Sequence, residues 1–513
     1  MDINSKLKEG YENAIKALKE EHRAEIDALK AAHAAEVAGL LQQIEALKEA
    51  IATLAAKIAE LEAKGKKDST NSDNPPSSDG PKKRYAASSL REKTGRPSGG
   101  QKGHEGATLE LSDAPDYIVE LKQQEQCECG GPIIVQTDSV TVRQVTDIQM
   151  PKKVVVEYRG QDGICERCGK AHKASFPESA KGTAAYGPEV QSALTYLTQH
   201  QLLPMKRAAE IMKDMFGLNV SQGTIIKSSQ DVYEKLEGPA ARIRDEIASS
   251  DVAGFDESGM RVSGSQYWLH SASTPKATFY TIHKSRGKEG MDAQGILPVF
   301  RGTAIHDHWK AYYHYMCAHG ECNAHHLRHL KFLYEVLGQE WAGEMACLLL
   351  RAKRHVELCR LFGSGELPMD DINEYERMYR AILGKAALLL GMPDPYASDG
   401  EGAASTGNAP AKKGKKTEPE RMVLRLAKYE QETLLFMYDF SVPFDNNGTE
   451  QSIRMPKLKQ KISGCFRTVS GAEVFARIRS YTSTVKKKGG NVYDGIKAAL
   501  RGDGGNFLYS EKT

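Results

Sequence analysis

Glu450 is the acidic residue of this sequence whose surroundings most suggest chemistry. It stands at the predicted start of a helix, after the turn-forming stretch Asp-Asn-Asn-Gly at 445–448. Residues 451–490 hold ten lysines and arginines and a single acid, although the whole chain has a net charge of only +3. An acid at the head of a basic segment is typical of a carboxylate that holds a metal beside a phosphate backbone. It is equally typical of a capped surface helix with a solvated basic face, so partner carboxylates must decide.

Two further acids end predicted strands. A buried strand at 252–256 ends in Asp256 and a short strand at 303–307 ends in Asp307, with strands at 266–272 and 277–283 and a helix at about 288–299 between them. A helical crossover that returns to the same sheet lays the last strand parallel to its partner. If that partner is the first strand, Asp256 and Asp307 lie side by side. Two such carboxylates repel unless a cation bridges them, and hard oxygen ligands favour Mg²⁺ or Mn²⁺. The competing interpretation is a pair of turn acids or helix caps, which Glu450 as a third acid disfavours.

Four of the nine cysteines fall in two close pairs, which predicts a structural metal site. Cys127 and Cys129 form the first pair, and Cys165 and Cys168 form a Cys-x-x-Cys pair about 36 residues later. Two thiolate pairs can converge on one tetrahedral Zn²⁺, and four protein ligands leave no position for water. The alternative is a relict knuckle with two buried thiols, because the first pair is one residue tighter than usual. Close pairs favour a metal in a reducing compartment over disulfides.

A third group of potential ligands, Cys322 and His325, lies between the second and third acids. Cysteine and histidine at this spacing could bind zinc, but no second pair completes such a site. We therefore expect Cys322, His325 and Arg328 to support the acids or to have a structural role.

The elements that must position these residues begin with a long helix over 1–64. Apolar residues recur along it in steps of three and four, and from Val37 onward they form regular heptads. This pattern predicts a coiled coil that pairs two chains as a homodimer. Between Ile15 and Val37 the seam follows an 11-residue repeat, which straightens the supercoil. The alternative is a helix packed on its own protein.

Residues 65–106 are rich in Pro, Gly, Ser and Lys and nearly lack large apolar residues. This composition predicts a disordered linker, which is either passive or a basic arm along DNA phosphates. Residues 107–185 are predicted to form a small β-rich zinc-binding module, with strands at 117–121, 133–136, 139–147 and 153–158.

Residues 186–248 have helical periodicity and contain a predicted helix-turn-helix. One helix covers 206–216, a turn follows at 217–220, and Ser221 is a good N-cap for a second helix to about Tyr233. The hairpin fits a DNA-reading module, although helical hairpins are common in other proteins. The first part of the α/β core then covers 249–326. A helical insertion covers 327–440, with a disordered loop at 397–419, and 441–513 complete the core with Glu450 and basic helices.

The composition argues against a membrane protein. No run of 18 apolar residues could span a bilayer, and the N-terminus lacks the apolar core of a secretory signal. We therefore expect a cytoplasmic protein of at least three modules.

With these features in place, the sequence resembles the insertion-sequence-66 type family of bacterial DDE transposases over nearly its whole length. Besides the coiled coil and the zinc module, the resemblance rests on Pro-Pro-Ser-Ser-Asp-Gly at 75–80, Gly-Gly-Gln-Lys-Gly-His at 99–104 and Ser-Gln-Gly-Thr at 221–224. It continues with Asp256-Glu-Ser258, Asp307 followed by Tyr312, Cys322-x-x-His325 with Arg328, and Asp445-Asn-Asn-x-x-Glu450 with Arg454. The chain departs from the family at Ser258, where Thr is usual, and at His308-Trp309, where Gly-Tyr is usual.

The resemblance implies a ribonuclease-H-like catalytic core with a triad of Asp256, Asp307 and Glu450. Glu257 is the alternative for the first position, but alternation along a strand points Asp256 and Glu257 to opposite faces. The implied reaction is cleavage of double-stranded DNA followed by strand transfer, with two Mg²⁺ (or Mn²⁺) ions held by the triad.

The resemblance also implies how the protein binds DNA. Basic residues of the last segment would hold backbone phosphates: Arg454, Lys457, Lys459, Lys461 and Arg467. The protein would associate with the bacterial nucleoid when bound, and helper proteins could take part. Two alternatives stay open: a ribonuclease-H-like nuclease that cuts without joining, and a non-catalytic zinc-containing DNA-binding protein.

Overall fold

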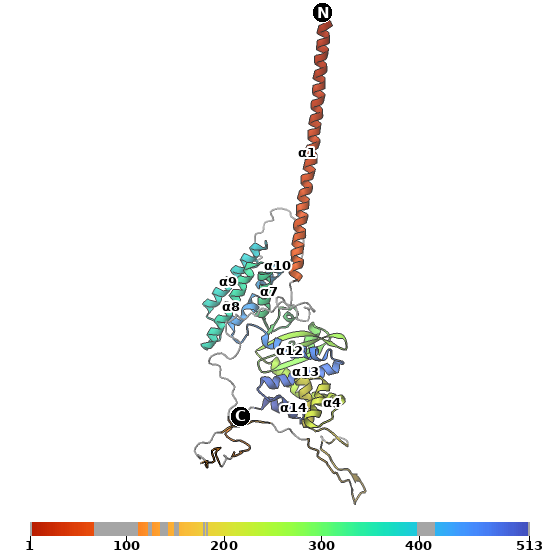
Figure 1. Cartoon of the computed structure of the whole chain (residues 1–513), viewed down its shortest axis with the longest axis vertical. Helices are drawn as coiled ribbons and strands as arrows, with labels where there is room; N and C mark the ends of the chain where they lie inside the picture. Colours follow the sequence, from red (N-terminus) through yellow and green to blue (C-terminus); the bar gives the residue numbers. More distant parts are fainter. Residues whose placement is uncertain are drawn as a thin grey trace. The chain divides into compact units, whose positions relative to one another are not determined.

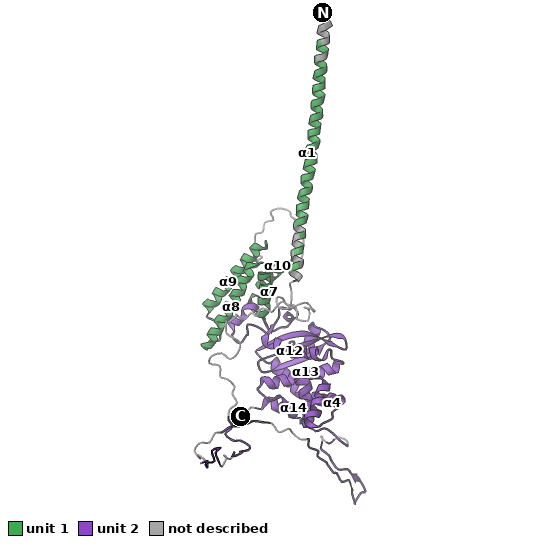
Figure 2. Cartoon of the chain, in the orientation of Figure 1, with its two compact units in different colours: residues 1–85, 323–430 green, residues 86–322, 431–513 purple. Residues whose placement is uncertain are grey.

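The computed structural model describes residues 3–65, 111–121, 126–133, 142–147, 153–177, 180, 183–397 and 416–510. The chain divides into two compact units, one of residues 1–85 and 323–430 and one of residues 86–322 and 431–513 (Figure 2). The predicted linker beyond residue 65 and most of the predicted loop at 397–419 lie outside the described residues. No helix in the described part of the chain is long and apolar enough to cross a membrane.

The predicted N-terminal helix is confirmed as α1 (Ile3–Gly65; Figure 1). The apolar side chains of its heptads are exposed along the helix, with Leu47 at 62% and Ile51 at 65% of their full accessible surface. Each Å² of apolar surface left in water costs about 25 cal/mol, so this stripe favours a covering partner. A second helix of the same kind would cover it, and this pairing stays a prediction.

A group of helices precedes the sheet and contains the predicted helical hairpin. The turn between α3 and α4 begins at Gly217, whose φ of 63° is the left-handed conformation that glycine adopts without steric cost. Ser221 Oγ then accepts the Thr224 N–H at 3.0 Å and caps α4, as predicted. The helices are α2 (Pro188–Thr195), the π-helical η2 (Tyr196–His200), α3 (Met205–Phe216), α4 (Gln222–Lys235) and α5 (Glu237–Ala248).

The sheet of the second unit has five strands in the order β5-β4-β3-β6-β7. The strand β3 pairs antiparallel with β4 on one side and parallel with β6 on the other. The expectation that the strand after the crossover lies parallel to the first strand is therefore confirmed. The bounds are β3 (Val252–Val262), β4 (Ser265–Ser273), β5 (Thr278–His283), β6 (Thr303–His306) and β7 (Ala318–Glu321).

Several predicted boundaries are corrected by the structure. The crossover helix α6 (Lys288–Gln294) stops well before residue 299, because Gly295 adopts a left-handed φ of 75° directly after it. The fifth strand, β7, was not predicted. Residues 117–121 and 153–158 are not strands, because their apolar side chains are exposed and no described segment pairs with them. The other two predicted strands of that region lie partly outside the described residues.

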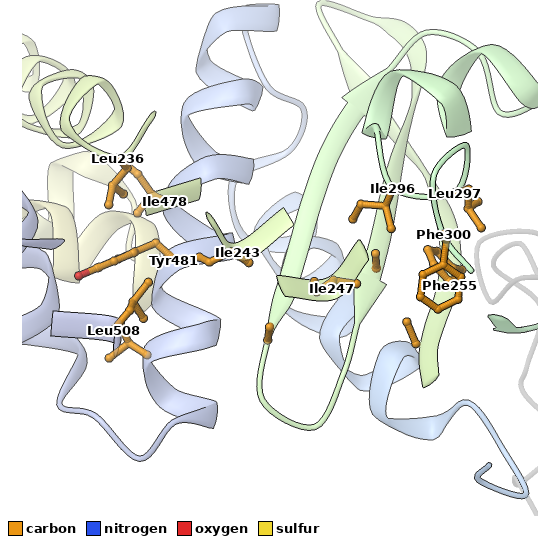
Figure 3. Packing of buried hydrophobic residues seen from close by; sticks show 14 of the residues in the cluster. Leu236, Ile243, Ile247, Phe255, Ile296, Leu297, Phe300, Ile478, Tyr481 and Leu508 are labelled. Atoms are coloured by element: carbon orange, nitrogen blue, oxygen red, sulfur yellow. The ribbon is translucent and has the colours of Figure 1, made fainter. Parts of the chain in front are cut away.

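The main hydrophobic core of the second unit lies between the sheet and helices that come before and after it in the sequence (Figure 3). The rings of Phe255 on β3 and Phe300 pack edge to face, with their centres 5.5 Å apart. Ile243 and Ile247 of α5 belong to the same cluster. Tyr481 is fully buried, and its O–H donates to the Gly495 carbonyl at 3.0 Å. The C-terminal helices are α11 (Glu430–Tyr438), α12 (Asn447–Ser463), α13 (Val469–Lys487), α14 (Val492–Leu500) and α15 (Gly504–Tyr509).

The first unit carries the helices between the second and third acids. Tyr379 on α9 donates to the Leu426 carbonyl on α10 at 2.9 Å, which joins two of them. The helices are α7 (Asn323–Glu335), α8 (Glu340–Leu361), α9 (Met369–Leu389) and α10 (Glu418–Lys428).

Candidate active site

Asp256 and Asp307 occupy equivalent positions on two neighbouring parallel strands. The ladder between β3 and β6 ends at the pair of Gly254 and Ile305. Asp256 lies two residues after Gly254, and Asp307 lies two residues after Ile305, so the two acids are in register. Side chains in register on neighbouring parallel strands point to the same face of a sheet. The parallel pairing therefore puts the first two predicted site residues just beyond the point where the pairing of β3 with β6 stops, in the interior of the sheet. The prediction that the first strand ends at Asp256 was wrong, because β3 continues to Val262 through its pairing with β4.

The third acid, Glu450, lies in the first turn of α12, and Asn446 ties that turn to the sheet. The Asn446 side-chain amide donates to the Phe255 carbonyl at 2.8 Å, directly before Asp256. The Asn446 backbone N–H points to Cys322 Sγ at 3.1 Å, just after β7. Asn446 is buried, so both bonds are shielded from water. The start of α12 is thereby fixed to the two parts of the sheet that flank the acids.

Gly254 lets α12 come this close to β3. A Cβ atom at this position would overlap Thr449 Oγ1 and Asn446 Oδ1, well inside the 3.0 Å that real Cβ contacts respect. Thr449 and Asn446 are both buried, so neither side chain can turn away into solvent. A glycine inside a buried strand often marks such a close approach, and here it determines where Glu450 is held.

The three carboxylates share one electrostatic environment. Removal of the Asp256 carboxyl group from water raises its pKa well above the usual range, and the charges of Glu257, Asp307 and Glu450 raise it further. The Glu257 N–H donates to Asp256 Oδ1 at 2.8 Å and offsets part of this effect. Neighbouring charges shift a pKa only at short range, so Asp307 and Glu450 both act on Asp256. A divalent cation between them would turn this repulsion into attraction.

Glu257, the alternative to Asp256, is engaged elsewhere. Its side chain is 1% exposed, and Oε1 accepts from Arg286 Nε at 2.8 Å and from Nη2 at 2.6 Å. Tyr312 donates its hydroxyl to the other oxygen at 2.5 Å, and burial together with the Glu257 charge raises the pKa of Tyr312. The Arg286 guanidinium lies 4.2 Å from the centre of the Trp309 ring. These fixed partners hold Glu257 in place and favour Asp256 as the ligand.

The predicted phosphate-binding residues divide into two kinds. Lys457 Nζ donates to the Gly259 carbonyl at 3.1 Å, and Lys459 Nζ donates to the Thr198 carbonyl at 3.2 Å. Burial lowers the pKa of both lysines. Their hydrogen bonds to these carbonyls brace α12 against its own unit. The exposed members of the set are Arg454, Lys461 and Arg467.

Cys322 adjoins the third acid. It is 1% exposed, and its Sγ lies 3.9 Å from Glu450 Oε1. A buried sulfur beside this carboxylate suits the supporting role that we predicted for it. His325 and Arg328 belong to α7, in the other unit, where Arg328 Nε donates to the Ala324 carbonyl at 3.2 Å.

The second cysteine pair forms a tight knuckle. Cys165 N–H donates to the Lys170 carbonyl at 2.9 Å, and Gly169 N–H donates back to the Cys165 carbonyl at 2.8 Å. The two-residue strands β1 (Gly163–Ile164) and β2 (Ala171–His172) pair on either side of it. Hydrogen bonds from the Cys168 backbone and thiol lower the pKa of the Cys165 thiol, which favours the thiolate that binds zinc.

The first cysteine pair repeats this turn with one residue fewer. Cys127 N–H donates to the Gly131 carbonyl at 2.9 Å, and Gly130 N–H donates to the Cys127 carbonyl at 2.8 Å. The backbone of Gly131, followed by the Cys127 thiol, lowers the pKa of the Cys129 thiol. The sulfurs of the two pairs, all in the described part of the chain, do not gather within 4.8 Å of one another. Their convergence on one Zn²⁺ therefore stays a prediction.

Two known protein families match parts of this chain. The family model described as Transposase IS66 family matches residues 183–474, which is more than half of the chain. The chain belongs to the IS66 transposase family. A family of unknown function (DUF6444) matches residues 10–110, and comparison with curated proteins finds no match.

The IS66 match contains β3, β6 and the first turn of α12, and thus all three acids. The four paired cysteines and α1 lie outside it. Assignment to this transposase family therefore rests on the segment that contains the three acids, and not on the modules before it.

Sequence reasoning assigned no role to three residues that shape this site: Gly254, Asn446 and Arg286. The signal for Gly254 was a glycine within a buried strand, two residues before an acid. Asn446 belonged to a motif whose turn chemistry was recognised, but its bond to β3 depends on tertiary packing. Arg286 gave no signal, because nothing local in the sequence connects it with Glu257.

Proposed function

We propose that this chain is a DNA transposase that cuts DNA strands at element ends and joins them to a target, with Asp256, Asp307 and Glu450 as its catalytic carboxylates. The observation that most supports the proposal is the parallel register of β3 and β6, in which Asp256 and Asp307 follow paired residues of the two strands. Asn446 also ties the start of α12, with Glu450 in its first turn, to β3. A ribonuclease-H-like core is the fold that this arrangement supports best. Membership of the IS66 family supplies the reaction class.

The donor set fits a hard divalent cation. Asp256, whose pKa is raised by burial and by the charges of Glu257, Asp307 and Glu450, would supply oxygen ligands and negative charge together with Asp307 and Glu450. Such ligands suit Mg²⁺ or Mn²⁺. Asp256, Asp307 and Glu450 would hold such ions. Bound there, they would supply Lewis-acid polarisation of the scissile phosphate and of the attacking oxygen.

The remaining residues of the site hold this arrangement rigid. Asn446 and Gly254 set the distance between α12 and β3, and Arg286 offsets the charge of Glu257 at the back of the sheet. Positioning to within a fraction of an ångström is what such chemistry requires. No covalent bond between protein and DNA is needed, so no serine or tyrosine nucleophile is assigned.

The other modules would bring DNA and a second chain to the site. The exposed side chains of Arg454, Lys461 and Arg467 would contact backbone phosphates, and the hairpin of α3 and α4 would read duplex DNA. The exposed heptad stripe of α1 would pair two protomers, so that two element ends are processed together. The two cysteine knuckles would share a structural Zn²⁺.

A joining assay with precut ends tests this function against a simple nuclease. Duplex DNA that ends in a free 3′-hydroxyl of the element terminus is incubated with the protein, Mg²⁺ and a supercoiled target. A transposase yields covalent products in which the precut end is joined to the target. A protein that nicks the target but yields no joined product would be a nuclease, and the proposal would fail.

A further inference from the structure

A large cavity opens in the second unit beside the proposed active site. Its volume is about 1210 Å³, and none of the three acids lines it. Asn446, Thr449 and Ser452 line it from the first turns of α12, and Gly254 and Ile305 line it from the strands. The turn of α12 that carries Glu450 thus forms part of the wall of a second, separate site.

Arg479 of α13 is a buried cation in the wall of this cavity. The residue is only 7% exposed. Its Nη1 donates to the His200 carbonyl at 2.9 Å, whereas its buried Nε has no hydrogen-bond partner. No carboxylate in the described part of the chain forms an ion pair with it. A buried charge is costly unless an opposite charge and full hydrogen bonding compensate it, so the site is incomplete as the protein chain alone forms it.

Lys487, two turns later on the same helix, is a second cation with neutral partners only. Its Nζ donates to Ser273 Oγ and to the Thr274 carbonyl, both at 2.6 Å, and to the Ala277 carbonyl at 3.0 Å. Burial lowers the pKa of Lys487 to about 8, so the amine is still mainly protonated at neutral pH. Like Arg479, it has no carboxylate partner among the described residues.

The other charged groups that line the cavity do not cancel this charge. Lys276 and Lys486 add positive charge. Burial lowers the pKa of His200 to about 4, and the charges of Arg479 and Lys486 contribute to this shift, so His200 is neutral at pH 7. Of the three acids in the lining, Glu246 accepts from Lys488 at 3.0 Å and is neutralised by it. Asp251 and Asp445 line the cavity without pairing with Arg479 or Lys487.

We propose that this cavity binds a phosphate group of a DNA strand, with Arg479 as its ligand and with Lys487, whose three N–H donors are already bonded, attracting the phosphate through its charge. The inference rests on the proposed function, because it takes the DNA substrate from there. A guanidinium donates hydrogen bonds to phosphate oxygens, and a nearby ammonium attracts them through its charge. Since α12 forms both the cavity wall and the support of Glu450, a strand held here would lie next to the strand at the carboxylates. The cavity thereby adds a contact that fixes DNA beside the site of cleavage.

The test measures DNA binding by the full chain without divalent ions, so that no chemistry takes place. Fluorescence anisotropy follows a labelled single-stranded oligonucleotide, and separately its duplex, over a range of NaCl concentrations. Lys487→Met and Arg479→Met should each lower the slope of log K against log salt, by about 0.7 for single strands and 0.9 for duplex. The matched control is Lys353→Gln, which removes one charge from α8 in the other unit.

Thermal unfolding of each variant separates loss of binding from loss of fold, and Lys487→Met serves if Arg479→Met does not fold. Folded variants that keep the wild-type slope on both DNA forms would overturn the proposal. Inorganic phosphate alone forms a further arm. If it raises the melting temperature of the wild type but not of Lys487→Met, while the DNA slopes stay unchanged, the ligand is a free phosphate and the DNA assignment is wrong. A changed slope in a protein that never cuts DNA would retain the cavity and refute only the proposed function.

Discussion

Replacement of Gly254 by alanine tests how the third carboxylate is positioned. A Cβ atom on this residue would overlap Thr449 Oγ1 and Asn446 Oδ1, and ordinary contact begins near 3.4 Å. Both partners are buried, and Asn446 is bonded to the Phe255 carbonyl. The start of α12 must therefore move away from β3 by about 1 Å, and Glu450 moves with it.

The size of the effect follows from this displacement. A misplacement of about 1 Å in a catalytic group costs about 100-fold in rate, or about 2.7 kcal/mol in the activation free energy. Forcing one methyl group into a packed interface costs about 1–3 kcal/mol in the free energy of unfolding, which a folded protein of this size can tolerate. Gly254→Ala is therefore expected to fold, to bind DNA and to cut it about 100-fold more slowly.

The assay is Mg²⁺-dependent cleavage of labelled DNA that carries an element end, under single-turnover conditions, with thermal unfolding of the same sample. Gly238→Ala on α5 is the matched control, because a Cβ atom there meets nothing within 4 Å. It should cut at the wild-type rate. Wild-type cleavage by a stably folded Gly254→Ala would refute the reasoning that the close approach of α12 to β3 positions Glu450.

Four other predictions concern the charge of Asp256, metal binding, zinc and assembly. In EDTA, Asp256→Asn should unfold at a higher temperature than the wild type at pH 7. The pKa of Asp256 is raised in the folded state, so the wild type loses stability as the pH rises and this carboxyl group ionises, whereas asparagine stays neutral. Equal melting temperatures that do not diverge with pH would contradict this. In the wild type, Mn²⁺ at 100 times its Kd should add about 2.7 kcal/mol of stability, and Asp256→Asn should lose this gain. Cys165→Ser should lose stoichiometric zinc by metal analysis, and zinc retained in full would exclude the four-cysteine site. Deletion of residues 1–65 should turn the dimer into a monomer by light scattering, whereas a dimer of the shortened chain would place the dimer contact elsewhere.

The sequence alone predicted the elements whose signals are local. Heptads predicted α1, the Ser221 cap predicted the start of α4, and a strand-helix-strand pattern predicted that β6 returns parallel to β3. These depend on periodicity, capping and the geometry of crossovers, which are legible in a short window. The register of Asp256 and Asp307 follows directly from that pairing.

What the sequence did not predict depends on tertiary packing. The segment Ala-His-Gly-Glu of β7 has no β-branched residue, and it forms a strand because β6 offers it an unpaired edge. The apolar runs at 117–121 and 153–158 have the composition of strands but no described partner, so they form no strand and their side chains stay exposed. The bonds from Asn446 to β3 and from Arg286 to Glu257 join residues that are 191 and 29 positions apart, beyond the reach of any local pattern.

Asp256, Asp307 and Glu450 are proposed to hold the metal ions that DNA cleavage requires. The most direct measurement is Mg²⁺-dependent cleavage of end-labelled element DNA by Asp256→Asn, Asp307→Asn and Glu450→Gln, with binding of the same DNA measured in parallel. Each variant is expected to bind DNA as the wild type does, and none is expected to cut it. Cleavage at the wild-type rate by any of the three would show that this carboxylate is not part of the catalytic site.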